Sequence, residues 1–295
     1  ALKPAGYVSG VFGKWHLGYE PQFNPMEHGW DDFFGYMGGN VHYFNHRETS
    51  ELHALYRGRL PVHVEGYMTH LITDSSISFI ERNKDKPFFL FVSHECPHFP
   101  FQGPNDAKKE INKTNWMKPD ADTYVAMLED LDSEVGRLLT VLDKHELTDN
   151  TLVIFVSDNG GFSGAANMGS FSGAKSTTME GGIRVPLIMR WPGKIRPGYV
   201  SDQVCMTFDL TRSLINLTQS KVPAMQLDGF DLVSHISKRK PNFPRTLFWR
   251  GKRGGRTWTA VRDGDMKFVR KTESQTQEWL FDLSKDLGEK NDLSS

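Results

Sequence analysis

The sequence predicts an α/β fold: a mainly parallel or mixed sheet flanked by helices, with a small antiparallel subdomain near the C-terminus. Two patterns carry this prediction. Short apolar runs adjoin polar loops, which indicates strands that are buried on both faces. Between these runs, apolar residues recur at spacings of three and four, which is typical of amphipathic helices.

Four apolar runs are expected to form the buried strands, at residues 7–12, 88–92, 152–156 and 185–189. The first three lead directly into loops that contain Lys, His, Asp or Asn, and the fourth follows such a loop. In open α/β sheets, ligands bind outside the carboxyl ends of the strands. The loops are therefore expected to carry the functional residues.

Three helices are expected between the strands. Residues 124–142 give the clearest pattern, with one apolar stripe formed by Tyr124, Leu128, Leu131, Val135, Leu138 and Leu142. A weaker pattern covers residues 68–83. A third covers residues 210–217, with Asp209 placed to act as its N-cap.

The character of the sequence changes after Pro241. Residues 257–262 and 266–270, separated by a short polar turn, indicate a hairpin, and residues 279–283 indicate a further strand. We therefore predict a larger domain over residues 1–240 and a small antiparallel subdomain over residues 241–295.

Composition excludes some classes of partner. The 295 residues carry a net charge of −1, which favours no nucleic-acid or membrane partner, and no apolar run is long enough to span a bilayer. Two cysteines are too few for a disulfide framework, so free thiols are favoured. A basic segment at residues 238–271 is either a solvated surface or a rim that attracts an anionic substrate.

Asp158 and Asn159 follow a predicted strand and supply hard oxygen ligands, which suit Ca²⁺ or Mg²⁺. The alternative is an ordinary turn, since Asp, Asn and Gly are common turn residues. Lys14 and His16 stand two apart, and a cation beside an imidazole suits anion binding with proton transfer. An ordinary surface lysine and a structural histidine are the alternative.

His98 is held between two prolines, which would stiffen its loop and fix the direction of the imidazole. Lys175 lies in a polar loop in which Glu180 and Arg184 are expected to form a bracing ion pair. His42 and His46 are candidates for the wall of a substrate site, and a structural role is the alternative for each of them.

Taken together and in this order, these segments resemble the type I sulfatase family of the alkaline-phosphatase superfamily. The matching blocks lie at residues 13–18, 97–100, 157–160, 175–186, 227–232 and 280–283. They extend over nearly the whole chain.

The resemblance implies an alkaline-phosphatase-like sheet and a sulfuric ester hydrolase with one divalent metal ion, expected to be Ca²⁺ with Mg²⁺ as the alternative. Asp158 and Asn159 would be metal ligands, and Lys14 and Lys175 would bind sulfate oxygens. His16 would hydrogen-bond the nucleophile and act as a base, and His98 would contact the ester oxygen and assist departure of the leaving group. The substrate would be a sulfated small molecule or a sulfated carbohydrate, and the compartment would be periplasmic, secreted or lysosomal.

One departure from the family stands out. The family nucleophile is formylglycine, made from Cys or Ser in a Cys/Ser-x-Pro-x-Arg motif, and neither Cys96 nor Cys205 lies in such a motif. We therefore expect a fragment that lacks an N-terminal segment and the last helix of the family, and that is inactive by itself. A phosphonate or phosphodiester hydrolase, or a non-catalytic relative that binds sulfated ligands, is the alternative.

Overall fold

The computed structural model describes residues 1–222 and 227–294, which fall into two compact units. The first unit comprises Ala1–Thr151 with Thr207–Leu232, and the second comprises Leu152–Met206 with Val233–Ser295. The units group segments by packing rather than by order along the chain. The domain boundary placed at residue 241 stays a prediction.

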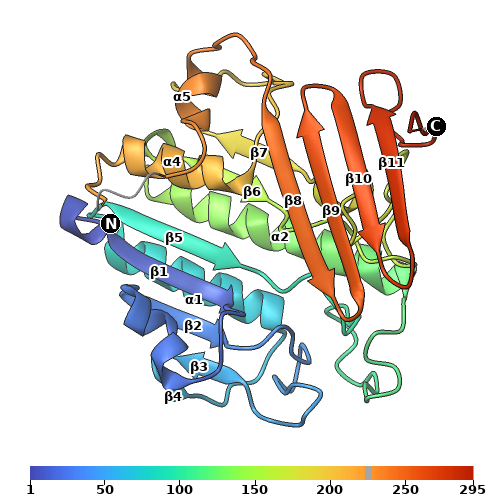
Figure 1. Cartoon of the computed structure of the whole chain (residues 1–295). Helices are drawn as coiled ribbons and strands as arrows, with labels where there is room; N and C mark the ends of the chain where they lie inside the picture. The colour runs from blue at the N-terminus through green and yellow to red at the C-terminus, as the bar shows by residue number, and fades with distance from the viewer. Residues whose placement is uncertain (223–226, 295) are drawn as a thin grey trace. The chain divides into compact units, whose positions relative to one another are not determined.

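A five-stranded mixed sheet forms the centre of the first unit, in the order β4-β3-β2-β1-β5 (Figure 1). Strands β1 (Val8–Lys14), β2 (Asp32–Tyr36) and β5 (Phe88–Ser93) are parallel, whereas β3 (Leu55–Arg57) and β4 (Leu60–Pro61) form an antiparallel edge. Strand β1 lies between β2 and β5 and is buried along its centre. This arrangement confirms the predicted mixed sheet and adds β2, which the sequence did not indicate.

Helices α1 (Met68–Asn83) and α2 (Ala121–Lys144) confirm two of the three predicted helices. Helix α1 packs against β1, β5 and α2, and Phe79 of α1 meets Phe12 of β1 with 5.5 Å between ring centroids. The side chain of Asp120 caps α2 by accepting the Thr123 amide at 3.0 Å. Short 3₁₀ helices occur at Lys3–Ala5, Pro21–Phe23, Pro25–His28 and Thr148–Asn150.

Helix α4 (Thr207–Leu217) is the third predicted helix, but the expected capping role of Asp209 was wrong. Asp209 lies inside the helix and is completely buried, and its Oδ1 accepts the Phe230 amide at 3.0 Å. A carboxylate that accepts from an amide 21 residues away makes a tertiary contact within the first unit.

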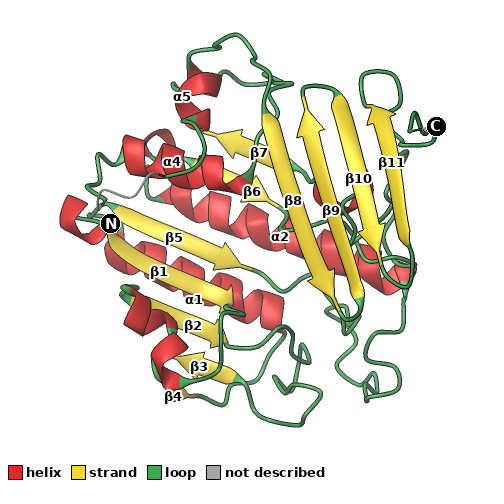
Figure 2. Ribbon diagram, in the orientation of Figure 1, coloured by secondary structure: helices red, strands yellow, loops and turns green. Residues whose placement is uncertain are grey.

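The second unit contains two antiparallel sheets (Figure 2). Strands β6 (Val153–Val156) and β7 (Leu187–Arg190) pair antiparallel, which differs from the parallel pairing expected for these two runs. Strands β8 (Thr246–Arg253), β9 (Arg256–Asp263), β10 (Met266–Thr272) and β11 (Thr276–Asp282) form the C-terminal sheet. The predicted hairpin is β9–β10, and β8 is an additional strand.

The C-terminal sheet buries one face. Ala260, Val269 and Phe281 form its core, against which Met179 and Trp249 pack. The short helices α3 (Glu180–Ile183) and α5 (Leu232–Ser237) complete the assigned elements. Within residues 1–222 and 227–294, no helix combines the length and the apolar character that crossing a membrane requires.

Candidate functional site

Lys14 and His16 lie at the carboxyl end of β1. Lys14 is the last residue of the strand, and His16 adopts φ 58°, a conformation that residues other than glycine rarely adopt. The His16 amide still donates to the Met37 carbonyl at 3.1 Å, beyond the end of β2. Backbone bonding therefore fixes His16 in an uncommon conformation, and such conformations concentrate at functional sites.

Two glycines shape the surroundings of this segment. A Cβ atom at Gly13 would lie 2.1 Å from the Ser93 carbonyl oxygen, so only glycine lets β1 and β5 approach this closely just before Lys14. A Cβ atom at Gly39 would lie 2.8 Å from Nε2 of His16. The bare backbone of Gly39 thus leaves the space that the His16 ring occupies.

The loop after β5 carries His98. The His98 amide donates to the Glu95 carbonyl at 2.8 Å, and the Tyr43 hydroxyl donates to the His98 carbonyl at 3.0 Å. Nδ1 of His98 lies 2.8 Å from the Phe99 carbonyl oxygen, which favours the tautomer with the proton on Nδ1. Because β1 and β5 are parallel neighbours with Gly13 opposite Ser93, Lys14 at the end of β1 and the loop that carries His98 lie at the same, carboxyl end of the sheet.

Glu95 also lies just beyond the carboxyl end of β5, and it was not among the site residues predicted from the sequence. Its carboxylate is buried, and Oε1 accepts the Val41 amide at 2.8 Å. Burial raises the pKa of Glu95 well above its usual range, while the Val41 amide and the charge of Lys14 act in the opposite direction. The sequence signal was a carboxylate two residues beyond the apolar run that forms β5.

His94, also missed, immediately follows β5. Both of its ring nitrogens are buried, and neither has a hydrogen-bond partner among the described residues. Burial lowers the pKa of His94 to about 4, so the ring is neutral at pH 7.

His42 and His46 are held inside the loop that follows β2. They are only 8% and 2% exposed. Nδ1 of His42 accepts the Phe44 amide at 3.2 Å, and Nε2 of His46 lies 3.1 Å from the Gly66 carbonyl oxygen. This bonding favours a structural role for both rings, and the substrate contact suggested by the sequence stays a prediction.

In the second unit, Asp158 and Asn159 follow β6, with Asp158 exposed. The hydroxyl of Ser157 donates to the Asn159 carbonyl at 2.9 Å, which closes the turn. The next residue must be glycine, because a Cβ atom at Gly160 would lie 1.8 Å from the Gly181 carbonyl oxygen.

Lys175 lies beside the same turn, since its amide donates to the Gly161 carbonyl at 2.9 Å. The predicted ion pair is present: Nη1 of Arg184 lies 3.3 Å from Oε2 of Glu180. The structure therefore brings Asp158, Asn159 and Lys175 into one loop cluster. Convergence of this cluster with Lys14, His16 and His98 stays a prediction.

The donors after β6 suit a hard divalent ion in kind but not in number. A carboxylate and an amide oxygen are the ligands that Ca²⁺ or Mg²⁺ prefers, yet Ca²⁺ takes at least six oxygens. In the part of the chain that the structure describes, no group of three or more His, Cys, Asp or Glu side chains could hold a metal. Asp158 and Asn159 can serve only as part of a ligand set.

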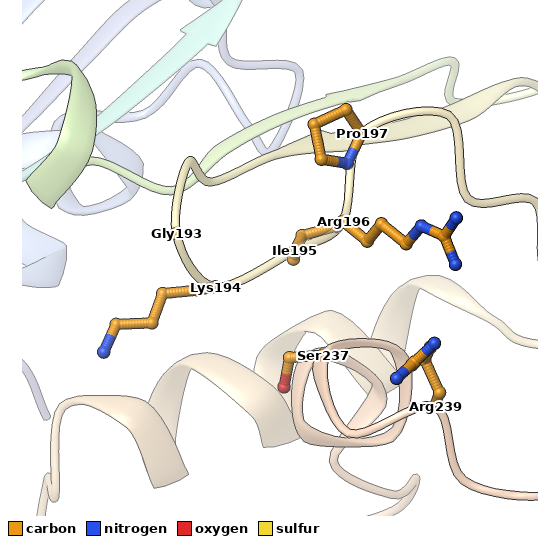
Figure 3. A pocket seen from close by; sticks show the side chains of 7 residues that line it. All are labelled: Gly193, Lys194, Ile195, Arg196, Pro197, Ser237 and Arg239. Atoms are coloured by element: carbon orange, nitrogen blue, oxygen red, sulfur yellow. The ribbon is translucent and has the colours of Figure 1, made fainter.

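The second unit also contains a pocket of about 510 Å³. It is lined by Gly193, Lys194, Ile195, Arg196, Pro197, Ser237 and Arg239. In Figure 3, Arg196 and Arg239 extend to the same side and Lys194 extends to the other. The pocket gathers positive charge and includes Arg239 of the basic segment 238–271, but none of the candidate catalytic, substrate-binding or metal residues lines it.

Comparisons with known proteins identify the family. The sulfatase family model matches residues 1–220, and the model for the C-terminal region of N-sulphoglucosamine sulphohydrolase matches residues 171–295. N-acetylgalactosamine-6-sulfatase from Canis lupus familiaris is 33% identical over 79% of this chain and 47% of its own length. The human enzyme of the same name is 31% identical over 85% of this chain and 50% of its own length.

Among solved structures, Ps i-CgsB in complex with k-i-k-neocarrahexaose superposes with a TM-score of 0.86 at 29% identity. That alignment covers 99% of this chain and 68% of the other. The chain spans about half the length of the curated relatives that it matches. Because the sulfatase model covers most of its residues, the chain belongs to the sulfatase family.

Proposed function

We propose that the protein containing this chain is a sulfuric ester hydrolase that converts R–O–SO₃⁻ and water to R–OH and sulfate. The proposal is carried by Lys14 at the end of β1 together with His16 and His98 in the loops after β1 and β5, at the carboxyl end of this parallel pair. A cation and two imidazoles at the carboxyl ends of such strands suit an anionic ester that needs charge stabilisation and proton transfer.

In this proposal, Lys14 and Lys175 bind the sulfate oxygens and stabilise the negative charge that develops in the transition state. His16 hydrogen-bonds the nucleophile and takes its proton. His98 acts at the ester oxygen and assists departure of the alcohol. Its Nδ1 contact with the Phe99 carbonyl would direct Nε2 toward the substrate.

Asp158 and Asn159 would contribute two oxygen ligands to a divalent ion. Sulfatases bind such an ion; we propose Ca²⁺ here, with Mg²⁺ as the alternative. When bound, the ion would add positive charge beside the sulfate. The 295 residues contain no Cys/Ser-x-Pro-x-Arg motif, so the formylglycine nucleophile would come from outside this sequence.

We propose a sulfated carbohydrate as the substrate. Two kinds of relative support it: the curated N-acetylgalactosamine-6-sulfatases, and a solved structure in complex with neocarrahexaose at 29% identity. The basic segment at residues 238–271 supports an anionic ligand as well.

The test uses the protein that contains this chain together with a formylglycine motif. Release of sulfate from a sulfated oligosaccharide should be detectable, and Lys175→Ala should reduce kcat about 10²- to 10³-fold. Paired sulfate and phosphonate esters of one alcohol form the second arm. Faster turnover of the phosphonate would favour a phosphonate hydrolase, and binding of the oligosaccharide without turnover would indicate a non-catalytic relative.

The metal proposal has its own test. Ca²⁺ should barely raise the Tm of the 295-residue chain, since Asp158 and Asn159 are too few ligands. It should raise the Tm of the protein with the formylglycine segment, and Asp158→Ala should abolish that rise, because binding to the native state alone stabilises it. Micromolar Ca²⁺ binding by the 295-residue chain alone would contradict this ligand assignment.

A further inference from the structure

Lys267 is a lysine with no exposed surface. It lies on β10, on the face of the C-terminal sheet that is turned toward the core. Its Nζ atom is 2.7 Å from Oε1 of Glu180 and 2.8 Å from Oε1 of Glu289. A buried ammonium group is tolerated only when carboxylates of this kind compensate for its lost hydration.

The cluster extends to a second cation. Oε2 of Glu180 faces Nη1 of Arg184 at 3.3 Å. With two carboxylates and two cations, the cluster of Glu180, Arg184, Lys267 and Glu289 is balanced in charge. Since its two carboxylates lie 109 positions apart, it joins distant segments of the second unit rather than neighbours along the chain.

The cluster also binds a backbone amide. Oε2 of Glu289 accepts the amide of Glu180, the first residue of α3, at 2.7 Å. Lys267 therefore holds the start of α3 in two ways: directly through the Glu180 side chain, and through Glu289, which binds the Glu180 amide. Charge-assisted bonds of this kind are shorter and stronger than neutral ones.

Helix α3 in turn holds both loops of the cluster formed by Asp158, Asn159 and Lys175. The Gly181 amide donates to the Ser172 carbonyl at 2.7 Å, and the Gly182 carbonyl accepts the Gly160 amide at 3.0 Å. Each glycine approaches its neighbours too closely for any side chain. A displacement of α3 would therefore move the loops on both sides of it.

Other contacts join the Lys175 loop to the C-terminal part of the unit. The Ser172 hydroxyl donates to the Gly288 carbonyl at 2.6 Å, and Nη1 of Arg253 donates to the Ser176 hydroxyl at 2.8 Å. Met179 packs on the core of the C-terminal sheet. These contacts hold the loop before and after Lys175, and among the groups that hold it Lys267, Glu180 and Glu289 are buried.

We infer that Lys267 is a positioning residue: through Glu180 and Glu289 it fixes α3, and α3 fixes the loops that carry Asn159 and Lys175. The C-terminal sheet, which carries Lys267, thus helps to fix the positions of the loops that carry Asn159 and Lys175. The roles of Asp158, Asn159 and Lys175 rest on the proposed function, whereas the mechanical link does not.

The experiment is hydrogen–deuterium exchange on the 295-residue chain and its Lys267→Met variant, which keeps a long unbranched side chain and removes the ammonium group. The amides of Gly160, Lys175 and Gly181 should exchange about ten-fold faster in the variant, while the β9–β10 ladder keeps its protection. Arg270→Met is the matched control. Arg270 lies on β10, as Lys267 does, and its variant loses an exposed ion pair with Glu278 of β11, so the loop amides should stay unchanged.

Glu289→Gln covers the case in which Lys267→Met does not fold. It removes one charge but keeps an oxygen that can accept the Glu180 amide, so a smaller increase in exchange is expected at the same three amides. Loop protection that matches the wild type in either folded variant would overturn the inference. So would exchange that rises equally in the loops and in the β9–β10 ladder, since that indicates only lower global stability.

Activity separates this inference from the proposed function. In the protein with the formylglycine segment, Lys267→Met should lower kcat about ten-fold or more, whereas Arg270→Met should not. An inactive wild type whose loops still loosen in Lys267→Met would reject the proposed function and leave the inference standing. An active wild type with unchanged loop protection in Lys267→Met would support the proposed function and overturn the inference.

Discussion

Oε1 of Glu95 accepts a hydrogen bond from the amide of Val41 at 2.8 Å, across 54 positions of sequence. This bond ties the loop after β5 to the loop after β2, beside the strand end that carries Lys14. A buried carboxylate in this position gives the first unit a dependence on pH that can be measured.

Glu95→Gln should stabilise the chain at high pH. Burial raises the pKa of Glu95 above the value of 4.5 that applies when it is unfolded. The native state therefore binds more protons, and the contribution of Glu95 to stability is fully present below pH 4.5 and lost as the pH rises toward the native pKa. A native pKa that is higher by one corresponds to about 1.4 kcal/mol of that contribution.

Urea denaturation at pH 5 and pH 8 would test this expectation. The gain of Glu95→Gln over the wild type should be about 1 kcal/mol or more at pH 8 and smaller at pH 5. A gain that does not change with pH would mean that the carboxyl group of Glu95 does not titrate in this range.

His94 should make the chain less stable in mild acid. Burial lowers its pKa from 6.5 to about 4, so the unfolded state binds the additional proton. Stability is then present above pH 6.5 and is lost as the pH falls toward 4. Between pH 7 and pH 5 the loss from this one ring should be about 2 kcal/mol.

The variant His94→Leu should lack this loss, whatever its stability at pH 7. The measurement is the free energy of unfolding at several pH values between 5 and 7.5. If the wild type and His94→Leu lose stability in parallel over that interval, the ring of His94 is protonated as easily in the native state as in the unfolded state.

Two Gly→Ala substitutions should act in opposite directions. Gly160→Ala places a Cβ atom 1.8 Å from the Gly181 carbonyl oxygen and should destabilise the second unit by about 2–3 kcal/mol. Gly136→Ala, in the exposed middle of α2, meets no atom within 4 Å and should stabilise by about 0.5–1 kcal/mol. Thermal denaturation of both variants should give Tm shifts of opposite sign; a Gly160→Ala variant as stable as the wild type would contradict the close packing of this turn on α3.

Gly39→Ala should disturb His16 without unfolding the chain. The new Cβ atom would lie 2.8 Å from Nε2 of His16, so the ring must shift. In the protein with the formylglycine segment, kcat should fall about ten-fold or more, since a displacement of about 1 Å at a catalytic group is costly. Gly255→Ala, which meets no atom within 4 Å, is the control for a neutral substitution. Unchanged kcat in Gly39→Ala would argue against a catalytic role for His16.

The sequence by itself determined the local elements and the residues at their ends. Helix α2 followed from the apolar spacing along its length, because that periodicity is a property of the segment alone. Strands β1, β5, β6 and β7 followed from continuous apolar runs, and the β9–β10 hairpin followed from its turn residues. Lys14, His98 and Asp158 could be chosen because they lie at the end of, or in the loop after, apolar runs that form strands. The expectation that these strands are buried on both faces holds only for the centre of β1, since every residue of β5 and β6 is exposed or only partly buried.

Strand pairing and the contacts between distant segments were decided only by the tertiary structure. The run that forms β6 reads as a parallel strand, yet its partner β7 is antiparallel, since pairing depends on the path of the chain between them. Asp209 was expected to cap a helix because it precedes an apolar helical pattern. The sequence does not indicate that its carboxylate accepts the amide of Phe230, 21 residues away.

Lys267 is the clearest case. From its charge alone, Lys267 would be expected at the surface. The alternation of side chains along β10, however, places it on the same face as Val269, which is buried. What makes burial of its charge tolerable is the pair of carboxylates on Glu180 and Glu289. Compensation of a buried charge depends on distances in space between groups that are far apart in sequence, and only the folded structure sets those distances.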